Sequence, residues 1–233
     1  MRRALLFASL VFAAPSFAQS VAAVAADFGP TDADPLVVTG TWTCVPGAVF
    51  DCGPRRLVFA SGAIVQATTA TFAAGEISVS GGAVVAGSQL SLTASAVGGA
   101  SGDVTIHGVL SAAGTDPGRS LDVVAAGRIF VLGAGRCTAA GTATAADGGA
   151  VVLAAGTELV VSGSPVSVDV SAGPLGAAGS ATLRATTGDV TMSKAVVGAG
   201  DAGGGTVVIE AGDDLVVSDV LLQGGVAPGA FLG

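Results

Sequence analysis

The sequence TTGDVTMS, Thr186–Ser193, returns with small changes along the chain. Similar phrases are SGDVTIHG at 101–108, AGEISVSG at 74–81 and AGRIFVLG at 126–133. In the first three of these four phrases, the residues after the glycine alternate between apolar residues and small or polar ones. Alternation with a period of two predicts a short strand that buries one face.

The glycine of this phrase recurs with an imperfect period. Successive copies are 24 to 32 residues apart, at Gly75, Gly102, Gly127, Gly156, Gly188 and Gly212. A period of this length is typical of stacked repeats, and its variation is expected to fall in loops. After Gly156 and Gly212 the apolar alternation starts one residue late. We expect a small bulge at those two turns to absorb the slip.

Two further strands are predicted in each unit. One precedes the glycine and ends on alanine, as in Leu121–Ala125, and a weaker one follows, as in Val109–Leu110. Three short strands cannot form a core alone, but stacked units bury one another's apolar faces. We therefore predict an all-β fold, a single-stranded parallel β-helix over residues 61–233 with about six coils. The crossover rule favours the right-handed form.

The first eighteen residues have the pattern of a secretory signal peptide. Arg2 and Arg3 precede an apolar run, and small residues precede Gln19. The alternative is an uncleaved membrane anchor, but the run is shorter than the ~20 residues that span a bilayer. No later stretch is long and apolar enough to span, so we expect no membrane span in the mature chain.

Residues 19–60 differ in composition from the repeats and are predicted to cap the N-terminal end of the solenoid. Within them, Cys44 and Cys52 flank a short loop. In an exported protein this spacing favours a disulfide between the two. Cys137 is then left over and is expected to be a small buried side chain.

Charge and composition limit the possible partners. The net charge is −8 and only 11% of the residues are charged, so the chain lacks the basic patch that nucleic acid or anionic lipid requires. His107 is the only histidine, and no Cys/His cluster has zinc spacing. We expect no cofactor and no metal.

Several acidic residues follow the repeated glycine and are expected to lie near one column. They are Glu76, Asp103, Asp189 and Asp213, with Arg128 and Thr157 between them. A column of carboxylates can bind calcium. The alternative is that aspartate favours corners because it accepts hydrogen bonds from nearby backbone N–H groups. The interruptions in the column favour this alternative.

Other candidate motifs are weaker. Gly198, Gly200 and Gly203 form a literal GxGxxG, but a predicted strand follows instead of the helix that a dinucleotide site needs. A polysaccharide-degrading site requires carboxylates gathered on one groove with a cation nearby. Asp213, Asp214 and Asp219 are close in sequence but not predicted on one face, and Lys194 is the only lysine. His107 is predicted on the surface, and no catalytic residue is assigned.

The repeat resembles that of filamentous-haemagglutinin-like and autotransporter passenger proteins. AGDDLVVS at 211–218, TGDVTMS at 187–193 and SGDVTIHG carry the resemblance, which covers about residues 61–225. It implies secretion by a Gram-negative cell and a rod used for adhesion or display. The family's secretion-domain motif is not evident in residues 19–60, and no translocator barrel is recognisable.

The sequence thus predicts an exported, non-catalytic β-helix scaffold at the cell surface or outside the cell, adhesin-like, with surface glycans or other cell-surface proteins as partners. The alternative is a glycan-active β-helix enzyme, a polysaccharide lyase or hydrolase. Carboxylates gathered with an arginine on one groove favour the enzyme. Featureless Ser/Thr/Gly faces favour the scaffold.

Overall fold

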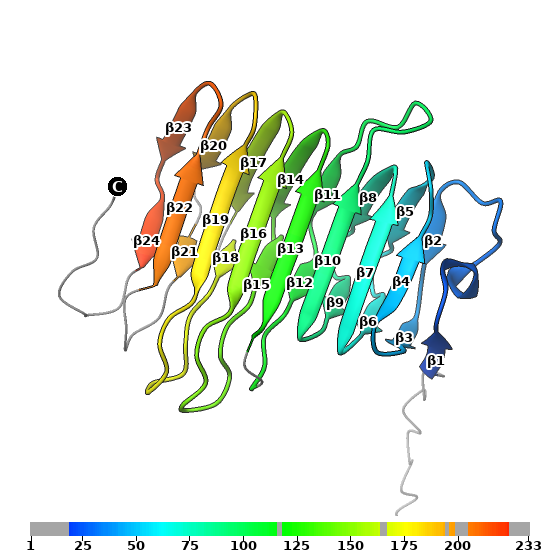
Figure 1. The fold of residues 1–233 in the computed structure, drawn as a ribbon, viewed down its shortest axis with the longest axis horizontal. Coiled ribbons are helices and arrows are strands. Elements are labelled where there is room, and N and C mark those ends of the chain that lie inside the picture. Colours follow the sequence, from blue (N-terminus) through cyan, green and yellow to red (C-terminus); the bar gives the residue numbers. More distant parts are fainter. Residues whose placement is uncertain (1–18, 116–117, 164–166, 194–195, 199–204, 224–233) are drawn as a thin grey trace, which may run out of the picture.

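Figure 1 shows an elongated stack of short strands in the computed structural model, which describes residues 19–115, 118–163, 167–193, 196–198 and 205–223. The described strands pair in parallel and form three sheets, named A, B and C here. The predicted signal peptide, residues 1–18, lies outside the described residues.

The sheets are given by their strands in order. Sheet A consists of β1 (Gln19–Ala22), β3 (Thr41–Cys44), β6 (Ile64–Gln66), β9 (Val84–Ala86), β12 (Val109–Ser111), β15 (Arg136–Thr138), β18 (Val168–Asp169), β21 (Val196–Gly198) and β24 (Leu221–Gln223). Sheet B consists of β2 (Leu36–Val38), β5 (Arg56–Phe59), β8 (Glu76–Val79), β11 (Val104–Ile106), β14 (Arg128–Gly133), β17 (Glu158–Gly163), β20 (Val190–Ser193) and β23 (Leu215–Ser218). Sheet C consists of β4 (Ala48–Asp51), β7 (Thr69–Ala74), β10 (Gln89–Ala94), β13 (Ser120–Ala125), β16 (Ala150–Ala155), β19 (Ser180–Ala185) and β22 (Thr206–Glu210).

From β4 onward, the chain visits sheets C, B and A in turn. Strands β7, β8 and β9 are followed by β10, β11 and β12, and each strand pairs with its counterparts in the units before and after it. The prediction of three short strands per repeat is therefore confirmed. Parallel strands that stack in three sheets are compatible with a β-helix solenoid.

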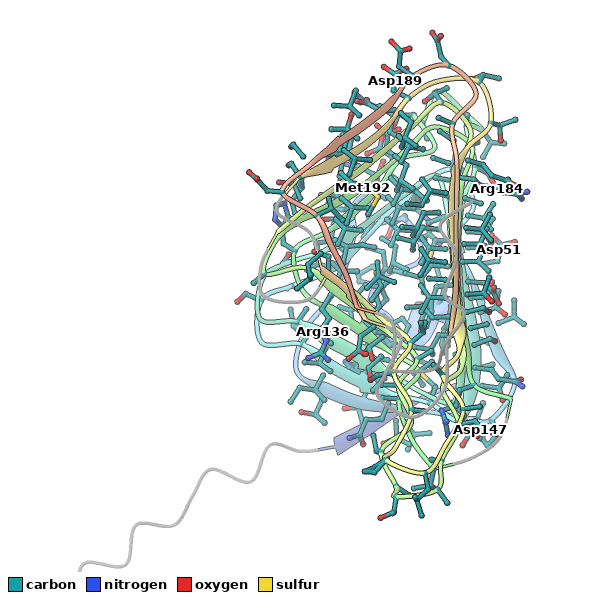
Figure 2. All side chains as sticks on the ribbon, turned by 90° about the vertical axis from the view of Figure 1, so that its left-hand side faces the viewer. Asp51, Arg136, Asp147, Arg184, Asp189 and Met192 are labelled. Atoms are coloured by element: carbon teal, nitrogen blue, oxygen red, sulfur yellow. The ribbon has the colours of Figure 1, made fainter. Side chains whose placement is uncertain are left out.

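The core is built from inward-facing columns that run along the stack. In sheet C, Leu92 lies level with Phe72 and Val123, and all three side chains are fully buried. Figure 2, viewed from the C-terminal end, shows the side chain of Met192 inside and those of Arg184 and Asp51 on the outer side of sheet C. The alternation after the repeated glycine thus marks the buried face, as predicted.

The one-residue slip after Gly156 is absorbed before the strand begins, as expected. Leu159 lies level with Ile129, and both are fully buried. Thr157 lies in the turn, where its N–H donates to the carbonyl of Gly127. The extra residue therefore lengthens the turn and leaves the buried face of β17 unchanged.

Residues 19–60 contribute strands β1 to β5 to the same three sheets. A short 3-10 helix, η1 (Ala25–Phe28), packs over them. Its Phe28 ring lies 4.9 Å from the ring of Phe50, which in turn stacks 4.9 Å from Phe72. The aromatic side chains therefore join this N-terminal segment to the first repeats.

The structure does not support the predicted disulfide, because Cys44 and Cys52 are both free, buried thiols. Cys44 ends β3 in sheet A, whereas Cys52 follows β4 in sheet C. Although Cys44 and Cys52 are close in sequence, they therefore do not lie on two paired strands. Burial raises the pKa of the Cys44 thiol to about 11 and that of Cys137 to about 12.

Alkylation under non-reducing conditions tests this assignment. We expect none of the three cysteines to react with iodoacetamide in the folded chain, because each is buried and its raised pKa keeps it protonated. All three should react after unfolding in urea, as intact-mass spectrometry will show. A cross-linked peptide containing Cys44 and Cys52 would contradict the free-thiol assignment.

Candidate functional site

Charged side chains form a column along one edge of the stack, where the chain turns from sheet C into sheet B. Figure 2 marks this edge at Asp189. Strand register places one residue of each successive unit level with the next: Arg56, Glu76, Asp103, Arg128, Glu158, Asp189 and Asp214. We call these residues the corner column. Neighbouring members are separated by one strand spacing, about 4.8 Å.

Two members of this column differ from the prediction. Aligning the repeats by their glycines placed Thr157 and Asp213 in it. The strand register places Glu158 and Asp214 there instead, because the turns after Gly156 and Gly212 each contain one extra residue. The column therefore ends in three consecutive carboxylates.

Carboxylates of the column bond to the next unit of the stack. One oxygen of Asp103 accepts the backbone N–H of Arg128 at 2.8 Å, and the other accepts its guanidinium at 2.8 Å. Glu76 accepts both the N–H and the hydroxyl of Ser101, and Asp189 accepts the N–H of Asp214. Asp103 and Asp189 thus accept backbone N–H groups at the corners, which is the role predicted for them in preference to calcium binding.

The environment of Asp103 favours its ionised form. Burial by itself raises the pKa of this carboxyl, but the hydrogen bonds from the side chain and backbone of Arg128 outweigh burial and lower it. The Asp103 side chain is 16% exposed, whereas that of Arg128 is 49% exposed. Asp103 is therefore a carboxylate near neutral pH and has no proton to donate.

Replacing Asp103 by asparagine is expected to lower the free energy of unfolding by about 1 kcal/mol at pH 7, since a charge-assisted bond to a half-exposed arginine is lost. Because folding lowers the pKa of Asp103, its contribution is fully present above the unfolded value of about 4 and is lost as the pH falls through the folded value. Urea unfolding at pH 7 and pH 3 will measure this. The difference between the two proteins should be smaller at pH 3 than at pH 7, whereas Asp32→Asn, at an exposed carboxylate, serves as the control. An equal difference at both pH values would contradict the assignment.

Beside the column, the outer faces of β5, β8 and β11 enclose a shallow hollow of about 340 Å³. We call it the sheet B groove. It is lined by Arg56, Leu57, Val58, Glu76, Ile77, Ser78, Asp103, Thr105 and His107. The groove therefore combines two carboxylates, one guanidinium, one imidazole and two hydroxyls on three neighbouring strands.

The polar groups of the groove differ in how far they are already engaged. Glu76 and Asp103 accept bonds from the next unit of the stack, and Arg56 lies 3.6 Å from a carboxylate oxygen of Asp34. His107 is exposed at the far end of β11. The imidazole and the hydroxyls of Ser78 and Thr105 can both donate and accept hydrogen bonds, so the groove suits a ligand rich in hydroxyl groups.

An aromatic ring lies on the same face, one strand further along. Phe130 is level with Thr105, and the guanidinium of Arg128 lies 5.1 Å from the centre of its ring. Arg128 therefore lies over the face of this ring while it bonds Asp103. The described residues that line the groove include no Phe or Trp.

The structure does not bring Asp213, Asp214 and Asp219 into this groove. They lie exposed around β23, at the C-terminal end of the stack, and Asp219 has the positive φ of 52°. Within the part of the chain that the structure describes, no three His, Cys, Asp or Glu residues are placed to hold a metal ion. Lys194, Gly200 and Gly203 lie outside the described residues.

Sequence reasoning missed the groove for two reasons. Arg56 lies within the segment predicted as a cap, so it was not counted with the repeats. Glu76, Asp103 and His107 were each noticed, but their approach to Arg56 depends on the register of three units. The signal available in the sequence was the charge at equivalent positions of successive phrases.

A scan against models of known protein families, a search of curated proteins and a search of solved structures each gave no match. In the described ranges, no helix is long and apolar enough to cross a membrane. The stacked parallel sheets and the sheet B groove are therefore the features of this chain that bear on its function.

Proposed function

We propose that this chain is an exported, non-catalytic scaffold that binds surface glycans through the sheet B groove. In this proposal it is a right-handed parallel β-helix of about six coils behind an N-terminal cap, since the crossover rule favours that hand. A rod of stacked coils presents its side faces along its whole length. The resemblance of the repeat to filamentous-haemagglutinin-like and autotransporter passenger proteins supports display at a Gram-negative cell surface.

The chemistry of the groove supports a sugar ligand. Sugars present hydroxyls that donate and accept, and Thr105, Ser78 and His107 offer complementary groups on neighbouring strands. Arg56 adds a cation that can pair with the carboxylate of an acidic sugar. Binding sites for small ligands are concave and carry a few convergent polar groups, as this groove does.

The observation that carries the non-catalytic assignment is the bonding of the two carboxylates. A glycoside hydrolase requires one carboxylic acid that gives up a proton and a second carboxylate that acts as base or nucleophile. Asp103 is held ionised by Arg128, and Glu76 bonds the backbone and hydroxyl of Ser101. Both therefore join successive units and neither is arranged as a proton donor.

A glycan array probed with the purified chain tests this function, with release of reducing ends assayed on the same glycans. We expect binding without turnover. His107→Ala should weaken binding by about tenfold, the equivalent of one lost hydrogen bond to a charged or polar partner. Ser91→Ala, on the outward face of β10 in sheet C, is the matched control and should bind as the parent does. Loss of binding in both variants, or binding in neither parent nor variant, would contradict a ligand site at the groove.

A second candidate is a glycan-active enzyme, because Glu76, Asp103, His107 and Arg56 line one groove. Carboxylates gathered with an arginine on one groove are the arrangement expected of such an enzyme. Release of reducing ends that disappears in Glu76→Gln would establish it and overturn the non-catalytic assignment. Turnover that persists in Glu76→Gln would show that Glu76 is not the catalytic group.

A further inference from the structure

One phenylalanine lies on the outside of the stack. The other phenylalanines that the structure describes, Phe28, Phe50, Phe59 and Phe72, are buried in the core. Phe130 follows the buried Ile129 in β14, so its side chain points outward from sheet B, and it remains partly exposed. Removing an aromatic ring from water is favourable. A ligand that covers Phe130 therefore gains from the burial of this ring.

Phe130 continues a row of side chains that crosses the sheet B groove. Strand register places Ser78 level with Thr105, and Thr105 level with Phe130. Ser78 and Thr105 line the groove on β8 and β11, and β14 is the next strand of sheet B, as Figure 1 shows. The ring therefore lies one strand spacing, about 4.8 Å, beyond the groove along the axis of the stack.

Arg128 supplies a polar group beside the ring. Its guanidinium lies 5.1 Å from the ring centre, while Nε and Nη2 donate to one oxygen of Asp103 at 3.3 Å and 2.8 Å. Within the described chain, Nη1 makes no hydrogen bond, and the Arg128 side chain is 49% exposed. Because a guanidinium has five N–H donors, the two on Nη1 remain for a ligand.

An aromatic ring next to hydrogen-bond donors suits a sugar. A sugar ring carries C–H groups on its faces and hydroxyls around its rim. The face of an aromatic ring is partly negative and attracts such C–H groups, and the donors on Nη1 can bond a hydroxyl of the rim. Phe130 and Arg128 therefore complement a sugar, as the hydroxyls and the imidazole of the groove do.

The groove and the ring together extend over more than one sugar. Arg56 begins β5 and Phe130 lies in β14, and these strands are three steps apart in sheet B, about 14 Å. A single sugar ring is shorter than this. A linear oligosaccharide aligned with the axis of the stack can contact both places at once.

We propose that Phe130 and Arg128 form a second subsite next to the sheet B groove, and that the ligand is a linear oligosaccharide that runs along the stack from β5 to β14. Phe130 then selects for chain length, because short sugars occupy the groove alone and longer ones also cover the ring. This inference rests on the proposed function, since it adds a subsite for the same ligand.

Oligosaccharide ladders test the proposal. The probes are cello-oligosaccharides, chito-oligosaccharides and oligogalacturonates of one to six sugars, titrated into the purified chain by calorimetry. We expect one or more series to bind with an affinity that rises about tenfold as the chain becomes long enough to reach the ring. Phe130→Ala should remove this rise and leave the affinity of the shortest bound sugar unchanged. Phe130→Tyr, which keeps the ring, should retain the rise.

Two further variants separate the ring from the groove. His107→Ala should weaken binding at every chain length, because His107 lines the groove. Val124→Ala removes an exposed apolar side chain from the outer face of sheet C, so it is the matched control and should bind as the parent does. Far-ultraviolet circular dichroism of Phe130→Ala should match that of the parent, because the ring lies outside the core.

Three outcomes would overturn the inference. They are the same rise with chain length in Phe130→Ala and in the parent, an equal weakening by Phe130→Ala at every length, and no binding of any ladder. The second would mean that Phe130 only supports the pairing of Arg128 with Asp103. In each case the proposed function stands if array glycans bind and His107→Ala weakens them. A parent that binds no glycan at all overturns both.

Discussion

Replacing Phe72 by alanine is expected to lower the free energy of unfolding by about 3–5 kcal/mol, the usual cost of truncating a buried phenylalanine. Phe72 is fully buried in β7, stacks on Phe50 and meets Phe59 edge-on at 5.3 Å. Its loss leaves a cavity between the N-terminal segment and the first repeats. Because a rigid stack of parallel strands cannot close around that cavity, the penalty should fall in the upper part of the range.

Urea unfolding followed by circular dichroism measures this effect. Thr71→Ala is the matched control, since Thr71 is the preceding residue of β7 and points outward. We expect the control to change stability by less than about 0.5 kcal/mol, as surface substitutions usually do. Similar losses for the two variants would mean that Phe72 and Thr71 do not lie on opposite faces of the sheet.

Replacing Gly156 by alanine is expected to cost about 2–3 kcal/mol, because overpacking against backbone forces the main chain to shift. A β-carbon at Gly156 would lie 2.0 Å from the carbonyl oxygen of Ala126, one unit earlier in the stack. The glycine N–H also donates to the carbonyl of Ala125 at 2.8 Å. The two successive corners cannot separate without weakening this bond, so the repeated glycine is required by the close approach of neighbouring units.

Thermal unfolding of Gly156→Ala beside Gly81→Ala tests this requirement. A β-carbon at Gly81 would meet only the carbonyl oxygen of His107, at 4.0 Å, so alanine fits there. We expect the Gly81 variant to lie within about 0.5 kcal/mol of the parent. Equal stability of the two variants would show that the units are not packed as closely at the corner as described.

The fold was largely predictable because its physical basis is local and repeated. The alternation after Gly102 and Gly188 specified which residues of β11 and β20 are buried. The alanine that ends the strand before the glycine is likewise buried at Ala125, Ala155 and Ala185. The one-residue slip after Gly156 could also be recognised in the sequence, because without a longer turn the apolar side chains of β17 would face the solvent. Chain handedness carries no such local signal in the sequence.

The candidate site was less predictable because it depends on register between units. Aligning the repeats by glycine placed Thr157 and Asp213 in the corner column, and only the pairing of Arg128 with Glu158 corrects this. The groove needs three strands in register before Arg56 meets Glu76 and Asp103. The expected disulfide shows the same limit, because spacing alone could not place Cys44 in sheet A and Cys52 just after a strand of sheet C.

The proposed function depends on coils that stack in order, so the most direct test measures that stacking. Nitroxide labels at Val49 and Thr182, on the outer face of sheet C, are five strand steps apart by register, a distance of about 24 Å at the usual spacing. Labels at Val49 and Val208 are six steps apart, about 29 Å. The three native thiols are buried and should stay unlabelled in the folded chain. Pulsed electron–electron double resonance should give two narrow distance distributions, whose centres differ by one strand spacing, about 5 Å. Broad distributions, or a second distance no longer than the first, would contradict the stacked-coil architecture and the groove that depends on it.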